Sequence, residues 1–199
     1  MSMVGNLARL PNATRETLHA RPELITRLLH PNMPAPAPKQ PGFLARLFGA
    51  KSAPLSQPTE SVPAFEPLAE SDTLYIDKAW HALHFLFTGT AWEGEPPADF
   101  LVTGGTQIGK VDVGYGPARS FTPAEVQSIA AFLDEQREDE LKSRIDLEAM
   151  QTLDKYPSVW SEDTNIEEEW EYLVTSFREM KQFIGQAAQA NLSMIVYIT

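Results

Sequence analysis

The stretch IEEEWEYLVTSFREMKQFI (residues 166–184) decides the fold, together with SMIVYIT (193–199), which closes the chain. In the first stretch, large apolar residues recur at the spacing of one helix face. They are Trp170, Leu173, Val174, Phe177, Met180 and Ile184. The second stretch is β-branched and aromatic, and it predicts a strand buried on both faces. A helix with one apolar face and a fully buried strand together indicate a domain that contains both helices and a sheet.

Working towards the N-terminus, a capping box starts another helix. Thr122 is the cap, Pro123 occupies the first helical position and Glu125 lies three residues after the cap. A further helix is predicted after it, ending before Pro157. Upstream, residues 108–115 alternate in the manner of a strand.

Shorter signals predict the first elements. Residues 3–10 alternate in part and predict a strand. Thr14 is a good N-cap for a helix over residues 15–29, which Pro22 divides into two because proline removes a backbone donor. A third helix is predicted from a cap at Ser71 or Asp72 to about residue 88.

These elements predict a single α+β domain over residues 1–199, with a mixed β-sheet, packed helices, and Trp80 and Trp170 in or near the core. A proline-rich insertion interrupts it at about residues 31–70, where nine of the sixteen prolines lie between 31 and 67. Inside the insertion, Phe43–Phe48 carries apolar residues on one face of a short helix. Such a short helix needs a surface to lie on, either its own domain or a partner.

Composition narrows the functional classes. The chain has no cysteine, which excludes disulfides, thiolate metal sites and cysteine nucleophiles. We find no apolar run that could span a membrane and no signal-peptide pattern, and we therefore expect a cytoplasmic protein. The net charge is −11. Residues 1–51 carry a net charge of +5, and residues 52–199 carry −16. An acidic body disfavours nucleic acid and suits a basic protein partner, although acidity also simply keeps proteins soluble.

The predicted helix over residues 72–88 carries the sharpest candidate site. A rotation of 100° per residue places Asp77, His81, His84 and Thr88 on one polar stripe of an otherwise apolar helix. Two imidazoles and a carboxylate could ligate a divalent metal or transfer protons, or could line a binding cleft without metal. Alternatively, the three side chains could hydrogen-bond one another and nearby backbone.

Two glycine-containing segments have features of anion-binding sites. Residues 104–110 begin as a phosphate-binding loop does, but Val111 stands where the hydroxyl residue belongs and a strand follows instead of a helix. Residues 114–119 could offer backbone amides and Arg119 to an anion or carboxylate, or could form a turn in which the arginine pairs with an acidic residue. Tyr156, Pro157 and Trp160 are expected to cover part of the core.

Several of these stretches resemble the signature segments of the YfbM-like family of bacterial proteins, a domain of unknown function. They are DKAWHALHFL (77–86), VGYGPAR (113–119), TPAE (122–125), MSMVGN (1–6) and PELI (22–25). The resemblance covers residues 1–29 and 70–199 and not the insertion. It implies a compact α+β domain in the bacterial cytoplasm and brings no activity, cofactor or catalytic residue.

The functional hypothesis from the sequence is a non-enzymatic binding module, with binding candidates Asp77, His81, His84, Tyr115 and Arg119. One version is an immunity or antitoxin-like protein that neutralises a basic partner. The alternative is a hydrolase with a metal or acid/base site at Asp77, His81 and His84. No cofactor is predicted, because no complete catalytic or cofactor motif occurs.

Overall fold

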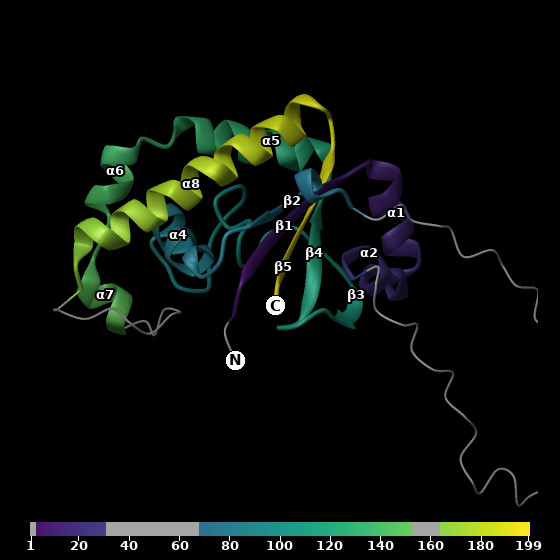
Figure 1. Cartoon of the computed structure of the whole chain (residues 1–199), viewed down its shortest axis with the longest axis horizontal. Helices are drawn as coiled ribbons and strands as arrows, with labels where there is room; N and C mark the ends of the chain where they lie inside the picture. Colours follow the sequence, from purple (N-terminus) through teal and green to yellow (C-terminus); the bar gives the residue numbers. More distant parts are fainter. Residues whose placement is uncertain (1–2, 31–67, 153–163) are drawn as a thin grey trace, which may run out of the picture.

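The computed structural model describes residues 3–30, 68–152 and 164–199. Its centre is a five-stranded sheet with the order β2-β1-β5-β4-β3 (Figure 1). The strands are β1 (Gly5–Leu10), β2 (Thr73–Tyr75), β3 (Thr106–Asp112), β4 (Pro117–Phe121) and β5 (Ser193–Ile198). Helices cover both faces of the sheet, which gives the three layers visible in Figure 1.

The two stretches that decide the fold behave as predicted. Residues 166–189 form α8 (Ile166–Gln189), and β5 lies in the middle of the sheet between β1 and β4. Met194 and Val196 belong to the larger hydrophobic cluster on one side of the sheet, whereas Ile195 belongs to the smaller one on the other side. The prediction of a strand buried on both faces is confirmed, because each face of β5 has its own helical layer.

The larger layer contains α4 (Ala79–Thr88), α5 (Pro123–Glu135) and α8, followed along the rim by α6 (Glu138–Ser143) and α7 (Leu147–Thr152). The smaller layer contains α1 (Asn12–Ala20), the 3₁₀ turn η1 (Pro22–Leu24) and α2 (Ile25–Leu29). Trp80 and Trp170 are both buried in the larger cluster, as expected. The α+β class is confirmed.

Several local predictions are also confirmed. Thr122 forms the predicted capping box with Glu125. The helix α4 ends at Thr88, as predicted, and Gly89 follows it in a left-handed conformation. Pro22 divides the first helical segment, although α1 begins at Asn12 after Pro11 and not after a Thr14 cap. After α5, one helix was predicted to run as far as Pro157. Within the described residues this segment forms two short helices, α6 and α7.

The sheet itself differs from the mixed sheet that was predicted. All four strand pairs are antiparallel, because β1 and β5 run in opposite directions and each outer strand reverses again. The strand β4 was not predicted, since residues 117–121 begin with proline and contain Arg119 and Ser120, which do not form an apolar run. Pro117 is tolerated at the first position of the strand, where a missing backbone donor costs little.

The predicted helix over residues 72–88 is wrong in its first half. Residues 70–72 form the 3₁₀ turn η2 (Glu70–Asp72), the next three form β2, and α4 begins only at Ala79. Leu74 pairs with Leu7 of β1, so this segment is used to extend the sheet at its edge. Asp77 has a φ of 44°, which breaks the chain direction between β2 and α4.

Other predictions lie outside the described residues. They concern most of the insertion, with Phe43–Phe48, and the loop with Tyr156, Pro157 and Trp160. Where the chain enters the described part again, Leu68 packs on the smaller hydrophobic cluster. Across the three described segments, no helix has both the length and the apolar character that crossing a membrane requires.

Candidate functional site

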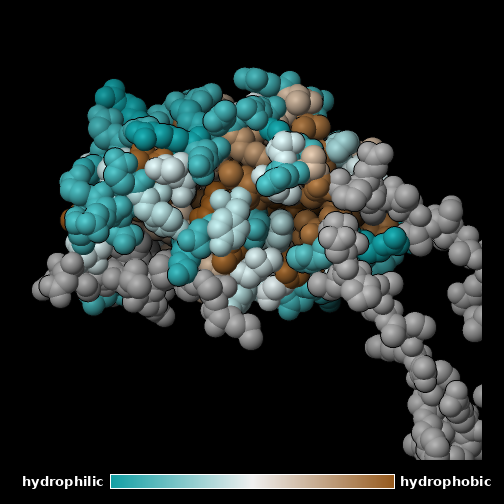
Figure 2. Space-filling view, in the orientation of Figure 1, coloured by the Kyte–Doolittle hydropathy of each residue, from teal (hydrophilic) through white to brown (hydrophobic). Residues whose placement is uncertain are grey.

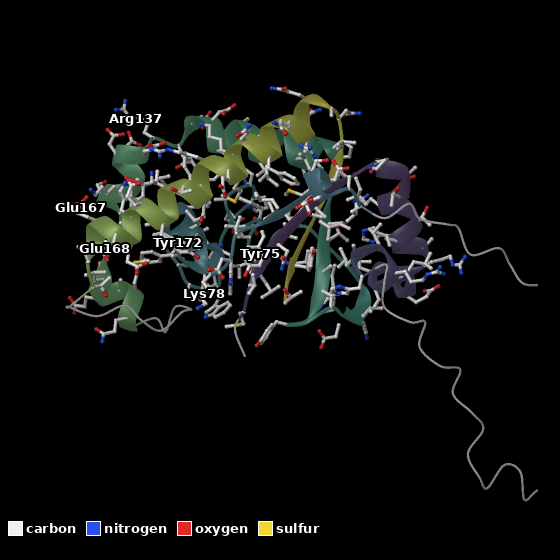
Figure 3. All side chains as sticks on the ribbon, in the orientation of Figure 1. Tyr75, Lys78, Arg137, Glu167, Glu168 and Tyr172 are labelled. Atoms are coloured by element: carbon white, nitrogen blue, oxygen red, sulfur yellow. The ribbon has the colours of Figure 1, made fainter. Side chains whose placement is uncertain are left out.

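Asp77 does not join the histidines. Its two carboxylate oxygens accept hydrogen bonds from the hydroxyls of Tyr75 (3.3 Å) and Tyr172 (3.2 Å). The Tyr172 hydroxyl in turn accepts a bond from the backbone N–H of Lys78 (3.0 Å), and Figure 3 shows these labelled side chains at the corner where α8 passes the start of α4. Asp77 therefore fixes α8 to the turn between β2 and α4.

Removing one hydroxyl tests this structural role. We expect Tyr172→Phe to lower the free energy of unfolding by about 1 kcal/mol, because it removes two hydrogen bonds at a side chain that is 38% exposed. Tyr75→Phe is the matched control, since the Tyr75 side chain is 60% exposed and its bond to Asp77 is long, at 3.3 Å. Urea unfolding of both variants measures the difference, and equal losses would contradict the assignment.

The two histidines are sealed inside the protein. Both side chains have zero exposure, and each Nε2 contacts a backbone carbonyl of the segment that follows α4. His81 contacts the carbonyl of Ala91 at 2.8 Å, and His84 that of Glu93 at 3.1 Å. Since a carbonyl only accepts, both Nε2 atoms are donors. The histidines thus fasten residues 91–93 to the helix.

The environment of His84 keeps its imidazole neutral. Burial lowers the pKa of His84 to about 4, with further lowering from His81 and Arg119 and a partial opposing effect from the Glu93 carbonyl. Its Nδ1 is buried and has no hydrogen-bond partner among the described residues, so a proton there would be an unsatisfied charge.

The candidate metal site was a separate hypothesis. Within residues 3–30, 68–152 and 164–199, no group of three His, Cys, Asp or Glu side chains is arranged so that it could hold a metal ion.

His81 has a second effect, which is to position a tryptophan. Its ring stacks on Trp80 with centroids 4.7 Å apart and planes 8° apart, and it lies 4.3 Å from the ring of Trp92. Trp92 is 52% exposed even though its neighbour Ala91 is fixed to His81. The rings of Trp80 and His81 therefore hold an exposed tryptophan in a defined place.

Arg119 is bound to backbone carbonyls instead of to an acidic side chain. Its Nη1 donates to the carbonyls of Phe100 (3.2 Å) and Gly104 (2.6 Å), and its Nη2 to that of Leu101 (2.7 Å). Burial lowers the pKa of Arg119 to about 10, although Asp99 nearby acts in the opposite direction. The guanidinium remains charged at neutral pH and ties the turns at residues 99–104 to β4.

Tyr115 owes its position to the turn between β3 and β4. Gly114 has a φ of 152°, and a Cβ on it would lie 2.7 Å from the carbonyl oxygen of Ile198. The backbone N–H of Tyr115 donates to that same carbonyl at 3.0 Å. The turn is thereby pressed against the end of β5, and the Tyr115 side chain remains 45% exposed.

Tyr115, Arg119 and the two tryptophans meet at one pocket of about 160 Å³, which we call the aromatic pocket. It is lined by Met3, Trp80, Trp92, Leu101, Val102, Tyr115, Pro117, Arg119, Val196, Tyr197 and Ile198. Of the binding candidates predicted from sequence, Tyr115 and Arg119 line the pocket, His81 supports its wall, and Asp77 lies elsewhere. Trp92 also lines the pocket and was not among the candidates predicted from the sequence. A tryptophan that stands just before glycine and proline residues indicates a loop, where binding residues are common.

Comparison with known proteins places the chain in a family. Residues 1–197 match the family described as "Domain of unknown function (DUF1877)". The chain belongs to this family. The DUF1877 match spans nearly the whole chain, the segment of the proline-rich insertion included, and confirms the YfbM-like resemblance.

A solved structure agrees with this assignment. The DUF1877 chain is similar to YfbM from Escherichia coli, described as a protein of unknown function, with 17% sequence identity and a TM-score of 0.60. The likeness covers 98% of this chain and 99% of that chain. At this identity, the likeness concerns the fold alone. No curated protein matches the chain.

Proposed function

We propose that this DUF1877 protein is a non-enzymatic binding module that holds one side chain of a partner protein in the aromatic pocket. The observation that carries the proposal is the combination of aromatic walls with a guanidinium that still has donors to offer. Arg119 uses three of its five N–H groups, and its Nε–H and second Nη2–H have no hydrogen bond within the described residues. These groups can bind a carbonyl or carboxylate of the partner.

The size of the pocket favours a single side chain over a cofactor. A cavity of about 150 Å³ holds one benzene molecule, whereas drug-sized ligands and cofactors occupy roughly 300–1,000 Å³. The aromatic pocket, at about 160 Å³, is in the first class. An aromatic or aliphatic side chain fits this volume.

The residue types at the rim also support protein binding. Trp92 and Tyr115 are 52% and 45% exposed, so they present large rings that a partner can cover. Tryptophan, tyrosine and arginine are the residue types enriched at energetic hot spots of protein interfaces. The Trp92 ring packs on Trp80 and His81, and the turn at Gly114 fixes the backbone of Tyr115. This order reduces the conformational entropy that is lost when a partner covers the two residues.

The charge of the protein supports a basic partner. Hydrophilic residues cover α6 and the first turns of α8 in Figure 2, and the labelled Glu167 and Glu168 lie at this end of the molecule in Figure 3. Glu167 pairs with Lys142, whereas Glu168 and Glu169 have no ion pair among the described residues. An immunity or antitoxin-like role towards a basic protein is the concrete form of this proposal, since such a surface would speed association.

The test begins with isolation of the partner from source cells on the immobilised protein, followed by measurement of its Kd. We expect Trp92→Ala and Tyr115→Ala each to weaken binding by roughly 10- to 30-fold, as hot-spot truncations do. Ile166→Ala is the matched control, because Ile166 is 39% exposed and does not line the pocket. A partner that binds both pocket variants as tightly as it binds the control would contradict the proposal.

A separate variant tests the charge of the partner. Glu168→Lys combined with Glu169→Lys should slow association and reduce its salt dependence, with little change in dissociation. Association rates measured at two salt concentrations by biolayer interferometry decide this point. An unchanged salt dependence would remove the basic partner from the proposal while leaving the aromatic pocket in place.

A further inference from the structure

A second pocket lies on another side of residues 96–105, where they meet the end of β4 and the start of α5. Its volume is about 240 Å³, several times the roughly 30 Å³ that one water occupies. It is lined by Pro96, Pro97, Asp99, Gly105, Phe121, Glu125, Ser128 and Ile129. No lysine, arginine or histidine is among these residues, and none of them lines the aromatic pocket.

Two carboxylates line this pocket, and each has one oxygen that accepts no hydrogen bond from the described residues. Asp99 is 6% exposed, and its Oδ2 accepts a bond from the Thr103 hydroxyl at 3.1 Å. One oxygen of Glu125, Oε2, accepts from the backbone N–H and the hydroxyl of Thr122, both at 2.7 Å. Within the described residues, Oδ1 of Asp99 and Oε1 of Glu125 accept no hydrogen bond. Neither oxygen is among the buried unsatisfied atoms of the described residues, so both remain accessible to a donor that enters the pocket.

The remaining walls are apolar. Pro96, Pro97, Phe121 and Ile129 contribute rings and aliphatic side chains to the same pocket. We propose that this second pocket binds the cationic side chain of a lysine or arginine on a partner protein. Such side chains have an apolar stem and a charged end, which match the apolar walls and the two unused acceptors respectively.

Nearby positive charge does not neutralise the two carboxylates of the second pocket. The Arg119 guanidinium acts on Asp99 from a distance, but it is bound to the carbonyls of Phe100, Leu101 and Gly104 and forms no ion pair with Asp99 within the described residues. The N-terminus of α5 carries about half a positive charge. Two full carboxylate charges exceed these contributions, so the pocket favours a cation over an anion.

The inference goes beyond the proposed function and can be tested without the partner. Isotope-labelled protein is titrated with N-acetyl-lysine methylamide and N-acetyl-arginine methylamide, with N-acetyl-norleucine methylamide as the uncharged comparison, and amide shifts are followed by NMR. We expect saturable shifts at Gly105 and Ser128 with the two cationic probes only. Agmatine carries the same cationic group as arginine but has no peptide groups. Comparing its binding with that of the arginine probe shows whether the peptide groups of the probe contribute.

Variants identify the carboxylates. Glu125→Gln and Asp99→Asn should each weaken binding of the cationic probes by roughly tenfold, because each removes a charged acceptor. Glutamine still serves in a capping box, and asparagine can still accept from Thr103, so both variants should fold. Glu135→Gln removes an equal charge from the exposed end of α5 and should have no effect. Equal binding of the norleucine probe, agmatine binding alone, or binding unchanged in Glu125→Gln would overturn the inference.

Discussion

Arg119→Met is expected to lower the free energy of unfolding by about 3–5 kcal/mol. The substitution keeps much of the side-chain volume but leaves the carbonyls of Phe100, Leu101 and Gly104 without their donor, in a part of the chain where Phe100 and Leu101 are fully buried. It also leaves Asp99 without the compensating charge. Urea unfolding, followed by tryptophan fluorescence and circular dichroism, measures the loss.

Arg119→Lys is the informative control for this prediction. Lysine keeps the charge near Asp99, but a single ammonium cannot span three carbonyls in the way that a planar guanidinium does. We expect a loss between that of Arg119→Met and zero. If both variants unfolded at the wild-type urea concentration, the guanidinium would not be holding residues 99–104 against β4.

The second large effect concerns pH. The pKa of His84 is about 4 in the folded protein, below its ordinary value of 6.5. As pH falls through 6.5, the unfolded chain takes up a proton that the folded protein still refuses, so the stability that depends on neutral His84 is lost progressively down to pH 4. Over this interval the loss attributable to His84 is about 3 kcal/mol. Well above pH 6.5, where His84 is neutral in both the folded and the unfolded chain, this contribution is complete and does not change with pH.

The variant His84→Gln separates this effect from other titrations. Glutamine can donate to the Glu93 carbonyl but has no proton equilibrium in this range. We expect its unfolding free energy to change less between pH 6.5 and pH 4 than that of the wild type, with the difference near the value above. Burial also lowers the pKa of His19. His19 and the carboxylates titrate equally in the wild type and in the variant, so their contributions cancel in the difference between the two proteins. Parallel pH profiles would show that the His84 imidazole is not kept neutral by the fold.

The sequence predicted the elements that are stabilised by interactions between nearby residues or that have a regular pattern of apolar residues. The stripe on α8, the capping box at Thr122 and the division at Pro22 were all visible, because each depends on residues within a few turns of one another. The apolar run of β5 predicted burial on both faces correctly, because only a central strand can bury every side chain of such a run.

The predicted grouping of Asp77 with the two histidines is wrong, because the helix that it required is interrupted. The stripe of Asp77, His81 and His84 assumed one continuous helix, but β1 recruits residues 73–75 as an edge strand and Asp77 turns the chain before α4 begins. Pairing with an existing sheet outweighs the weak intrinsic helix preference of three residues. Tyr115 and Arg119 both line the aromatic pocket, and their role in binding stays a prediction. The sequence did not indicate that Arg119 would bind carbonyls.

By itself, the sequence determined the secondary-structure class, the apolar faces, the acidic character and the YfbM-like family, since these follow from periodicity, composition and motifs along the chain. Only the tertiary structure decided which polar side chains are structural and which face a pocket. His81, His84 and Arg119 each satisfy backbone carbonyls of residues distant along the chain or beyond a turn. Burial and long-range pairing create these roles, and neither is encoded in local spacing.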